Sequence, residues 1–302
     1  MAMERIQEAE GHLRRAQEHL NQMAESMRQA RKLEAKQASE PISLEVAALP
    51  VETRVLLTPE ELVSSEKHSW KNFLGKEIKV PAPPQELLDT LSNAQEQGVT
   101  VFEAHYLPAI EFKQNLRYPG WKVKPGAWYW EQIKTGRVAK DAANLDGAWV
   151  LVDGSQKPDY DNGRQLYEND PFGKILAKLR NEGNIEVPSS YKHVPETSRF
   201  AVTPDERESH FYVALAQVLK VDANQVRVPR EIEFNVLGNI HHPDWGQTNT
   251  WEWAHDRFGD DGRLDGGSSN SGGLTDVDYD WHDYRCDGIG FRPLVVFPSK
   301  KS

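Results

Sequence analysis

Residues 248–267 read TNTWEWAHDRFGDDGRLDGG, and this stretch decides which fold the chain is expected to have. Its tryptophans can anchor a core. Its short polar residues and glycines favour loops and short strands. The adjacent pair Gly266 and Gly267 suits a tight approach of two backbones, because glycine carries no side chain. We therefore expect short strands and long loops, with no helix, after residue 243.

The next stretch, residues 275–293, reads TDVDYDWHDYRCDGIGFRP and contains five aspartates and the chain's only cysteine. A D-x-D-x-D run also opens an EF-hand loop, which then requires glycine at position six and glutamate at position twelve. Trp281 and Asp287 occupy those positions, so the EF-hand pattern fails. Asp276, Asp278 and Asp280 would share one face of a strand, which leaves a loose Ca²⁺ site as an alternative.

Other candidate chemistry in the chain is weak. His241 and His242 could bind a metal together with Asp244, but adjacent side chains point apart in an extended chain, and HHPDWG is typical of a turn. Cys286 has no helix N-terminus or histidine partner that would activate a thiolate. The chain contains no G-x-S-x-G, Walker A or G-x-G-x-x-G motif. No catalytic residue, metal or cofactor is therefore expected.

The composition is that of a globular protein, with 38% hydrophobic and 27% charged residues. Of the net charge of −10, residues 243–292 contribute −7, from eleven acidic and four basic residues. Such a surface repels phosphate backbones, so nucleic acid is not an expected partner. No apolar run of about 18 residues is present, and the N-terminus has no apolar h-region. Neither a membrane span nor a secretory signal is expected.

The N-terminal segment 4–38 follows a heptad pattern. Its a positions are Ile6, Leu13, Leu20 and Met27, and its d positions are Ala9, Ala16, Met23 and Ala30. This spacing predicts a coiled-coil-like helix over residues 1–40 that can self-associate through residues 4–38. A single amphipathic helix packed on its own domain is the alternative. Residues 41–80 are interpreted as a proline-rich linker with a short helix capped at Thr58, and residues 81–302 as a ligand-binding domain.

Helix and strand patterns mix within residues 81–302, so the fold class is α+β. Helices are expected over 83–98, over 169–183 with Asp170 as its cap, and over 203–221, where Thr203 and Glu206 form a capping box. Strands are expected over 99–107 and 147–153. The stretch IGFRPLVVF at 289–297 predicts one buried closing strand.

A compositional absence marks the C-terminal region. No Lys, Glu, Gln or Met occurs from Trp253 to Ser299, whereas these types fill 62 of residues 1–252, so about twelve would be expected. Aspartate occurs nine times from Asp256 to Asp287. A loop preference for short polar side chains explains part of this. Randomising only the adenines of an Asn codon, AAC or AAT, explains all of it, because Lys, Glu, Gln, Met and Trp cannot arise. Trp253 and Trp281 would then be fixed positions.

These motifs carry a family resemblance. The patterns W-E-W at 251–253, R-x-x-G-G at 263–267 and G-F-R at 290–292 resemble the C-terminal half of the C-type lectin fold of the formylglycine-generating-enzyme (sulfatase-modifying factor) type. The chain is most similar to variable proteins of diversity-generating retroelements, which occur in phages, bacteria, archaea and their viruses. There, a reverse transcriptase copies a template with adenine-specific errors into the 3′ end of the gene. The resemblance covers roughly the last 65 residues, with a variable region at about 250–293.

The resemblance implies a rigid scaffold that displays changeable side chains, as antibody loops do. The implied scaffold positions are Trp251, Glu252, Trp253, Arg263, Gly266, Gly267, Gly272, Gly273, Leu274, Gly290, Phe291 and Arg292. The implied variable, ligand-binding positions are His255, Ser268, Asn270, Ser271, Asp278, Tyr279, Asp280, His282, Asp283, Tyr284, Cys286 and Gly288. So acidic a set predicts an unknown protein or cell-surface ligand that is basic or amide-rich.

Two alternatives to a diversified binding protein stay open. The first is an oxidoreductase of the formylglycine-generating type. Formylglycine-generating oxidases need a pair of active-site cysteines, and this chain has one. The related iron-dependent sulfoxide synthases need a histidine triad that the sequence does not locate, and no Ca²⁺ motif of sugar-binding lectins is visible. The fold therefore does not imply the enzyme. The second alternative is a fixed lectin-like assembly module that acts through the N-terminal helix. Location is left open, with synthesis in the cytoplasm and display on a virion or cell surface as one option.

Overall fold

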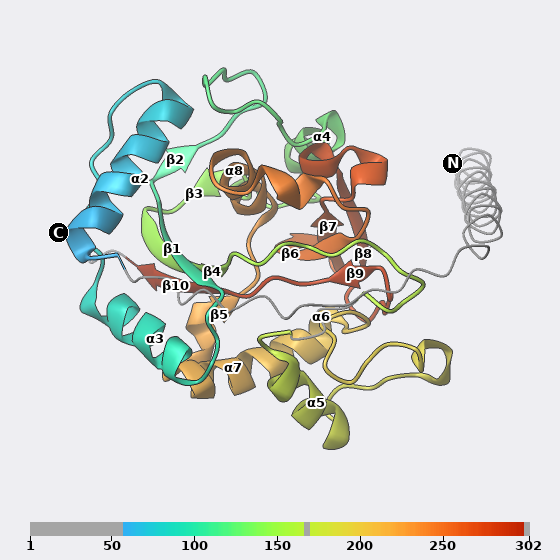
Figure 1. The fold of residues 1–302 in the computed structure, drawn as a ribbon. Coiled ribbons are helices and arrows are strands. Elements are labelled where there is room, and N and C mark those ends of the chain that lie inside the picture. The colour runs from blue at the N-terminus through green and yellow to red at the C-terminus, as the bar shows by residue number, and fades with distance from the viewer. Residues whose placement is uncertain (1–56, 166–169, 299–302) are drawn as a thin grey trace, which may run out of the picture. The chain divides into compact units, whose positions relative to one another are not determined.

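The computed structural model describes residues 57–165 and 170–298, which form a mixed α+β architecture (Figure 1). The heptad segment 4–38 lies outside these residues, so its self-association stays a prediction. The helices in chain order are α2 (Pro59–Leu74), α3 (Gln85–Glu96), α4 (Ala127–Thr135), α5 (Gly173–Asn181), α6 (Pro204–Glu206), α7 (Tyr212–Leu219) and α8 (Glu231–Ile240). The strands are β1 (Phe102–Leu107), β2 (Ile110–Glu111), β3 (Asn144–Leu145), β4 (Ala148–Asp153), β5 (Val226–Arg227), β6 (Trp251–Phe258), β7 (Gly262–Gly266), β8 (Val277–Trp281), β9 (Ile289–Gly290) and β10 (Leu294–Pro298).

The first four-stranded sheet has the order β1-β4-β10-β5, and all its pairs are antiparallel. All six residues of β4 are buried, because helices cover both faces. Trp149 and Leu151 pack into one core with α3 and α7, whereas Val150 and Val152 pack into a second core with α2 and α8. The alternation of neighbouring side chains along β4 thus separates the two cores. Figure 1 shows α8 on one side of this sheet and α3 and α7 on the other.

The second four-stranded sheet has the order β8-β7-β6-β9. Its β6 and β7 are an antiparallel hairpin, and β9 pairs with β6 in parallel. The expectation of one continuous closing strand over 289–297 is wrong. The chain leaves the second sheet after β9 and enters the first sheet as β10, with residues 291–293 between them. Pro293 lacks the amide hydrogen that a continuous ladder needs, and Arg292 turns inward to an ion pair.

The capping signals of the sequence are present in the structure. Thr58 and Glu61 form a capping box at the start of α2, and Thr203 and Glu206 form one at the start of α6. The single helix expected over 203–221 is interrupted, however, by a π-helical turn at Arg207–Phe211. The Asp170 cap is also wrong, because α5 begins only at Gly173 and Phe172 is its N-cap residue. The Asp170 carboxylate accepts the Phe172 amide at 2.8 Å and pairs with Arg199.

The compact unit begins earlier than the sequence indicated. The proline-rich composition of residues 41–80 predicts a linker there and a domain that begins near residue 81. In the structure, Trp70, Phe73 and Leu74 of α2 are buried in the second core, and the Trp70 indole donates to the Tyr106 carbonyl at 2.7 Å. The apolar face of α2 therefore contributes to the core.

Candidate functional site

A buried ion pair holds the scaffold residues of the two sheets together. The Arg292 guanidinium donates to both carboxylate oxygens of Glu252, at 3.1 and 2.9 Å. It also donates to the Ser155 carbonyl at 2.8 Å and lies 3.9 Å from the Trp245 ring centre. Arg292 is fully buried and Glu252 nearly so. The W-E-W and G-F-R motifs, 40 residues apart in the chain, thus meet in one bidentate contact.

The glycines of the expected scaffold lie where backbones approach closely. A Cβ on Gly266 would lie 2.3 Å from the Asp276 carbonyl oxygen, and one on Gly273 would lie 2.3 Å from the Gly246 carbonyl oxygen. Gly273 also has a φ of +62°, a region that glycine adopts without strain. These positions accept only glycine, which is how a fixed scaffold position behaves. The remaining expected scaffold residues are buried except Trp251, which is half-buried, and Gly272, which is exposed.

Sequence reasoning missed Lys157, the residue that joins the loops around this scaffold. Its ammonium group is buried and donates to the Thr250 carbonyl at 2.6 Å and to the Gly267 carbonyl at 2.5 Å. Burial lowers the pKa of Lys157 to about 8. The sequence gives little indication of this role. Lys157 follows a buried strand and its turn, and a lysine in such a place is usually exposed.

The expected variable residues are concentrated in the β8 segment, which we define as residues 277–284. β8 is an edge strand, and all five of its residues are at least partly exposed. Tyr279, Trp281 and Tyr284 are 36%, 58% and 40% exposed, although large aromatic side chains are usually buried. Asp278 and Asp283 are exposed among them. Trp281 is expected to be a fixed position, because Trp cannot arise from an Asn codon through changes of adenine. Its side chain contributes to the exposed surface and not to the core.

Tyr279 has a structural contact as well as exposure. Its ring stacks on Phe258 of β6 with a centroid distance of 3.9 Å and on Trp128 of α4 at 6.0 Å. Phe258 is buried in a third core that also contains Tyr129 and Leu264. The Tyr279 side chain therefore covers the edge of this core, and a smaller residue at this position would uncover Phe258.

The turn after β8 is tied to distant segments by side chains. His282 Nδ1 lies 2.7 Å from an Asp205 carboxylate oxygen, and the Arg285 guanidinium pairs with Glu206 at 2.6 Å. His193 Nε2 lies 2.9 Å from the Asp287 carboxylate. Pro204–Glu206 and the segment around residue 193 thus support the turn from both sides, which holds its exposed residues on a fixed framework.

Six expected variable positions lie outside the β8 segment. Asn270 and Ser271 are exposed, but they lie in the connection between β7 and β8, at the opposite end of β8 from Tyr284. His255 lies on β6, where the pairing register with β7 shifts, and the strand β7 separates it from β8. The expectation for Ser268 is wrong. Its side chain is fully buried and donates to the Asn249 carbonyl at 3.1 Å, so it is not displayed.

Gly288 and Cys286 are also poor display positions. Gly288 is buried beside Trp251. Cys286 is half-buried, and burial raises the pKa of its thiol to about 11. Cys286 is therefore a thiol at neutral pH, which agrees with the sequence expectation that it is not an activated nucleophile.

The carboxylates near β8 do not converge on one point. Burial and the neighbouring Asp278 raise the pKa of Asp280 to about 6, and the same causes raise the pKa of Asp276 to about 6. Burial and the carboxylates of Asp280 and Asp278 also raise the pKa of the buried Asp265 well above its usual range. In the described ranges 57–165 and 170–298, the groupings of side chains able to hold a metal lie elsewhere, so the loose Ca²⁺ site has no support here.

Those groupings correct the expectation for His241 and His242. Each histidine lies beside a glutamate and shares His105 as a neighbour, and Asp244 takes no part. The two side chains do not diverge as in an extended chain, because His241 is the C-terminal cap residue of α8. Burial opposes the charged form of His105, but hydrogen bonds to Glu103 and Glu66 outweigh it and raise the pKa of His105 to about 9. Sequence reasoning missed both glutamates because they belong to β1 and α2.

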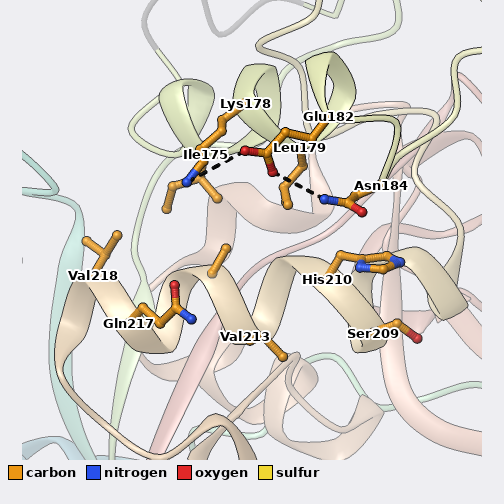
Figure 2. A pocket seen from close by; sticks show the side chains of 11 residues that line it. Ile175, Lys178, Leu179, Glu182, Asn184, Ser209, His210, Val213, Gln217 and Val218 are labelled. Carbon is orange, nitrogen blue, oxygen red and sulfur yellow. Dashed lines mark hydrogen bonds and ion pairs between the residues drawn. The ribbon is translucent and has the colours of Figure 1, made fainter.

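A hollow of about 390 Å³ lies between α5 and α7 (Figure 2). Lys178 and Glu182 form an ion pair of 3.8 Å across its rim, and the Asn184 amide donates to Glu182 at 3.2 Å. Val213 and His210 line the opposite wall. None of the expected site residues lines this hollow.

Comparisons with known proteins give no relative. No family model matches the chain, and none of the curated proteins or solved structures compared with it gives a significant match. Among the described residues, no helix has the length and apolar character needed to cross a bilayer. The fold itself is that of a mixed α+β protein with two four-stranded sheets.

Proposed function

We propose that this chain is a ligand-binding protein whose C-terminal region, with a C-type lectin fold of the formylglycine-generating-enzyme type, displays diversified side chains. The β8 segment forms the centre of the binding surface. Its ligand is a protein or cell-surface molecule with basic or amide groups, and its diversity arises by adenine-specific copying of a template into the 3′ end of the gene.

One observation carries the proposal. From residue 253 to residue 298, sixteen positions are exposed, and none of them holds Lys, Glu or Gln, the side chains that most often cover protein surfaces. Fifteen of the sixteen hold residues that Asn codons reach through changes of adenine, and Trp281 is the sixteenth. The buried residues of the same region include Trp253 and Arg292, which follow the demands of packing.

The geometry supports binding by preorganisation. Tyr279, Trp281 and Tyr284 offer exposed aromatic area on a sheet and a turn that ion pairs hold in place. Aromatic residues give much contact area for little loss of side-chain entropy, and the neighbouring Asp residues adapt their hydrogen bonds to the ligand.

The test is the DNA around the gene. We expect a second copy of the segment that encodes residues 250–293, differing from the coding copy only where the template has adenine, next to a reverse transcriptase gene. Codons for Asp278, Asp283 and Tyr284 should correspond to Asn codons in the template, whereas those for Glu252 and Arg292 should be identical in both copies. Absence of such a copy, or differences scattered over all four bases, contradicts the proposal.

A further inference from the structure

A cluster of histidines and glutamates lies outside the β8 segment, where β1 meets the end of α8. Glu103 and His105 are two residues apart on β1, so both side chains point to the same face of the strand. His242 follows α8 and reaches the same place. The side chains of Glu103, His105 and His242 are 19%, 9% and 12% exposed, so three polar groups are withdrawn from water together.

The two contacts of Glu103 have the spacing of ligand atoms around a small tetrahedral metal ion. One oxygen of Glu103, Oε2, lies 3.3 Å from His105 Nε2 and 3.0 Å from His242 Nε2. All three atoms lie within 4.8 Å of one another. Ligand atoms bound at about 2.0 Å to tetrahedral Zn²⁺ are about 3.3 Å apart. An ion can therefore enter with shifts of only a few tenths of an ångström at the two Glu103 contacts.

A further carboxylate holds His105 in the orientation that a metal ligand needs. Glu66 Oε1 lies 2.9 Å from His105 Nδ1, and Glu66 Oε2 accepts the Tyr106 amide at 3.1 Å. A carboxylate at Nδ1 keeps a proton on that nitrogen, so Nε2 presents its lone pair to a metal once the Nε2 proton is released to water. This arrangement accompanies most metal-bound histidines. Glu66 is itself buried, so its position is fixed by these two contacts.

Neighbouring groups hold the side chains of His242, His105 and Glu103 in place. The His242 ring stacks on Trp245 with a centroid distance of 4.3 Å and an interplanar angle of 1°. The His241 ring stacks on His105 at 4.0 Å. Glu103 is seated against Gly154, where a Cβ would lie 2.2 Å from its Oε1. The residue after β4 must therefore be glycine for the Glu103 carboxylate to lie here.

A second set of ligands, Glu66, His105 and His241, fits less well. Glu66 Oε1 is 3.7 Å from His241 Nε2, and both Glu66 oxygens already bind groups of β1. The His241 ring instead stacks on His105 with a centroid distance of 4.0 Å, which accounts for its place.

We propose that Glu103, His105 and His242 bind one Zn²⁺ ion, with Glu66 as a positioning residue for His105. Zinc takes the place of the hydrogen bonds that now join the two imidazoles to Glu103. Two histidines and one glutamate are a ligand set of zinc sites that keep a fourth position for water. Glu103 and His105 line a cavity of about 260 Å³ whose other walls include Leu62, Leu91 and Phe102, and this cavity has room for that water.

The experiment measures Zn²⁺ binding to the full chain without an affinity tag, freed of metal by chelation and titrated against a chromogenic chelator. We expect one Zn²⁺ per chain. His242→Asn and Glu103→Gln should each weaken binding at least 100-fold, and Glu66→Gln should weaken it by about 10- to 100-fold. The matched control is His241→Asn, one residue away, which should change the affinity less than about threefold. Co²⁺ in place of Zn²⁺ should give the intense visible absorption of tetrahedral Co²⁺, and His242→Asn should abolish it.

Circular dichroism of each variant shows whether it is folded. His242 and Glu103 are partly exposed, so their substitutions should leave the fold intact. If His241→Asn abolishes binding while His242→Asn keeps it, the ligand assignment is overturned in favour of the second set. If folded wild-type protein takes up no Zn²⁺, or if all four variants bind as the wild type does, the cluster is a hydrogen-bonded network and the proposal is wrong. None of these outcomes depends on the binding function of the β8 segment.

Discussion

At the residue scale, close backbone contacts and buried polar groups determine which side chains the fold accepts. Gly266 and Gly273 could be recognised because a glycine pair near a strand signals close backbone approach, and the structure gives each a carbonyl oxygen at 2.3 Å from a would-be Cβ. Lys157 and Glu66 could not, because what makes each special is burial against segments 93 and 39 residues away. Residue type alone predicts an exposed lysine and an exposed glutamate.

The Glu252–Arg292 pair should be essential to stability. In Glu252→Gln, the Arg292 guanidinium stays buried but loses its counter-charge, and such a loss costs about 3–5 kcal/mol. We expect the free energy of unfolding in urea to fall by this amount. The control is Glu77→Gln, which removes the partner of Lys71 in an ion pair whose side chains are 57% and 80% exposed. That change should leave the free energy of unfolding nearly unchanged, because solvent screens an exposed pair. Equal losses for the two variants would contradict the role given to the buried pair.

The raised pKa of Asp280 makes a pH-dependent prediction. Its pKa of about 6 in the folded chain exceeds the usual value of 3.8, so the folded state prefers the protonated form. The stability that this preference gives is present at pH below about 4 and is lost as the pH rises through 6. Asp280→Asn mimics the protonated form, so it should stabilise the protein by about 1 kcal/mol at pH 7 and by much less at pH 4.

Urea unfolding of both proteins at pH 7, 5 and 4 checks the Asp280 prediction. The free energy difference should shrink steadily with falling pH. The matched control is Asp260→Asn, which removes an exposed carboxylate outside β8 and should change the free energy of unfolding little. A pH-independent gain for Asp280→Asn would show that the carboxylate is not strained in the folded state.

At the element scale, helix ends and buried strands were predictable, and breaks within elements were not. Capping boxes at Thr58 and Thr203 require only four consecutive residues, so the sequence contains the whole signal. The π-turn at Arg207–Phe211 has no such signal, since Arg207 and Phe211 are buried by packing from other segments. The division of residues 289–298 between two sheets likewise depends on strands that are distant in the chain.

The seam between β7 and β8 gives a steric prediction. In Gly266→Ala, the new methyl group would lie 2.3 Å from the Asp276 carbonyl oxygen, so β8 must move away from β7. Overpacking of this kind costs about 1–3 kcal/mol, and we expect a lower melting temperature. Gly288→Ala is the control, because its methyl group would meet Cys286 Sγ at 3.6 Å, an ordinary contact. If both variants melt alike, the close approach at Gly266 does not limit the fold.

At the scale of the whole molecule, most of the negative charge is concentrated in the C-terminal region. Residues 243–292 contribute −7 of the net charge of −10. Aspartates on an edge strand such as β8 also discourage pairing with the edge of another sheet, so part of this charge opposes aggregation through β8. The sequence predicted the acidic C-terminal region and the α+β class correctly. It did not predict that Asn270 and Tyr284 lie at opposite ends of β8, because the lengths of strands and turns set that separation.

The acidic β8 segment should select basic or amide-rich partners. From an unbiased displayed peptide library, peptides bound by the full chain should be enriched in Lys, Arg, Asn and Gln. Their affinity should fall about tenfold or more between about 0.05 and 0.5 M salt, because the exposed charges are screened.

Two double variants separate the local charge from the total charge. Asp278→Asn with Asp283→Asn removes two exposed charges of the β8 segment, whereas Glu77→Gln with Glu96→Gln removes two exposed charges elsewhere. Only the first pair should weaken binding and flatten its dependence on salt. If both pairs act alike, the attraction comes from the overall charge of the molecule, and the β8 segment is not the binding surface. An affinity that does not respond to salt would contradict the electrostatic part of the proposal and leave the aromatic contacts of Trp281 and Tyr284 as its basis, which Trp281→Ala then tests directly.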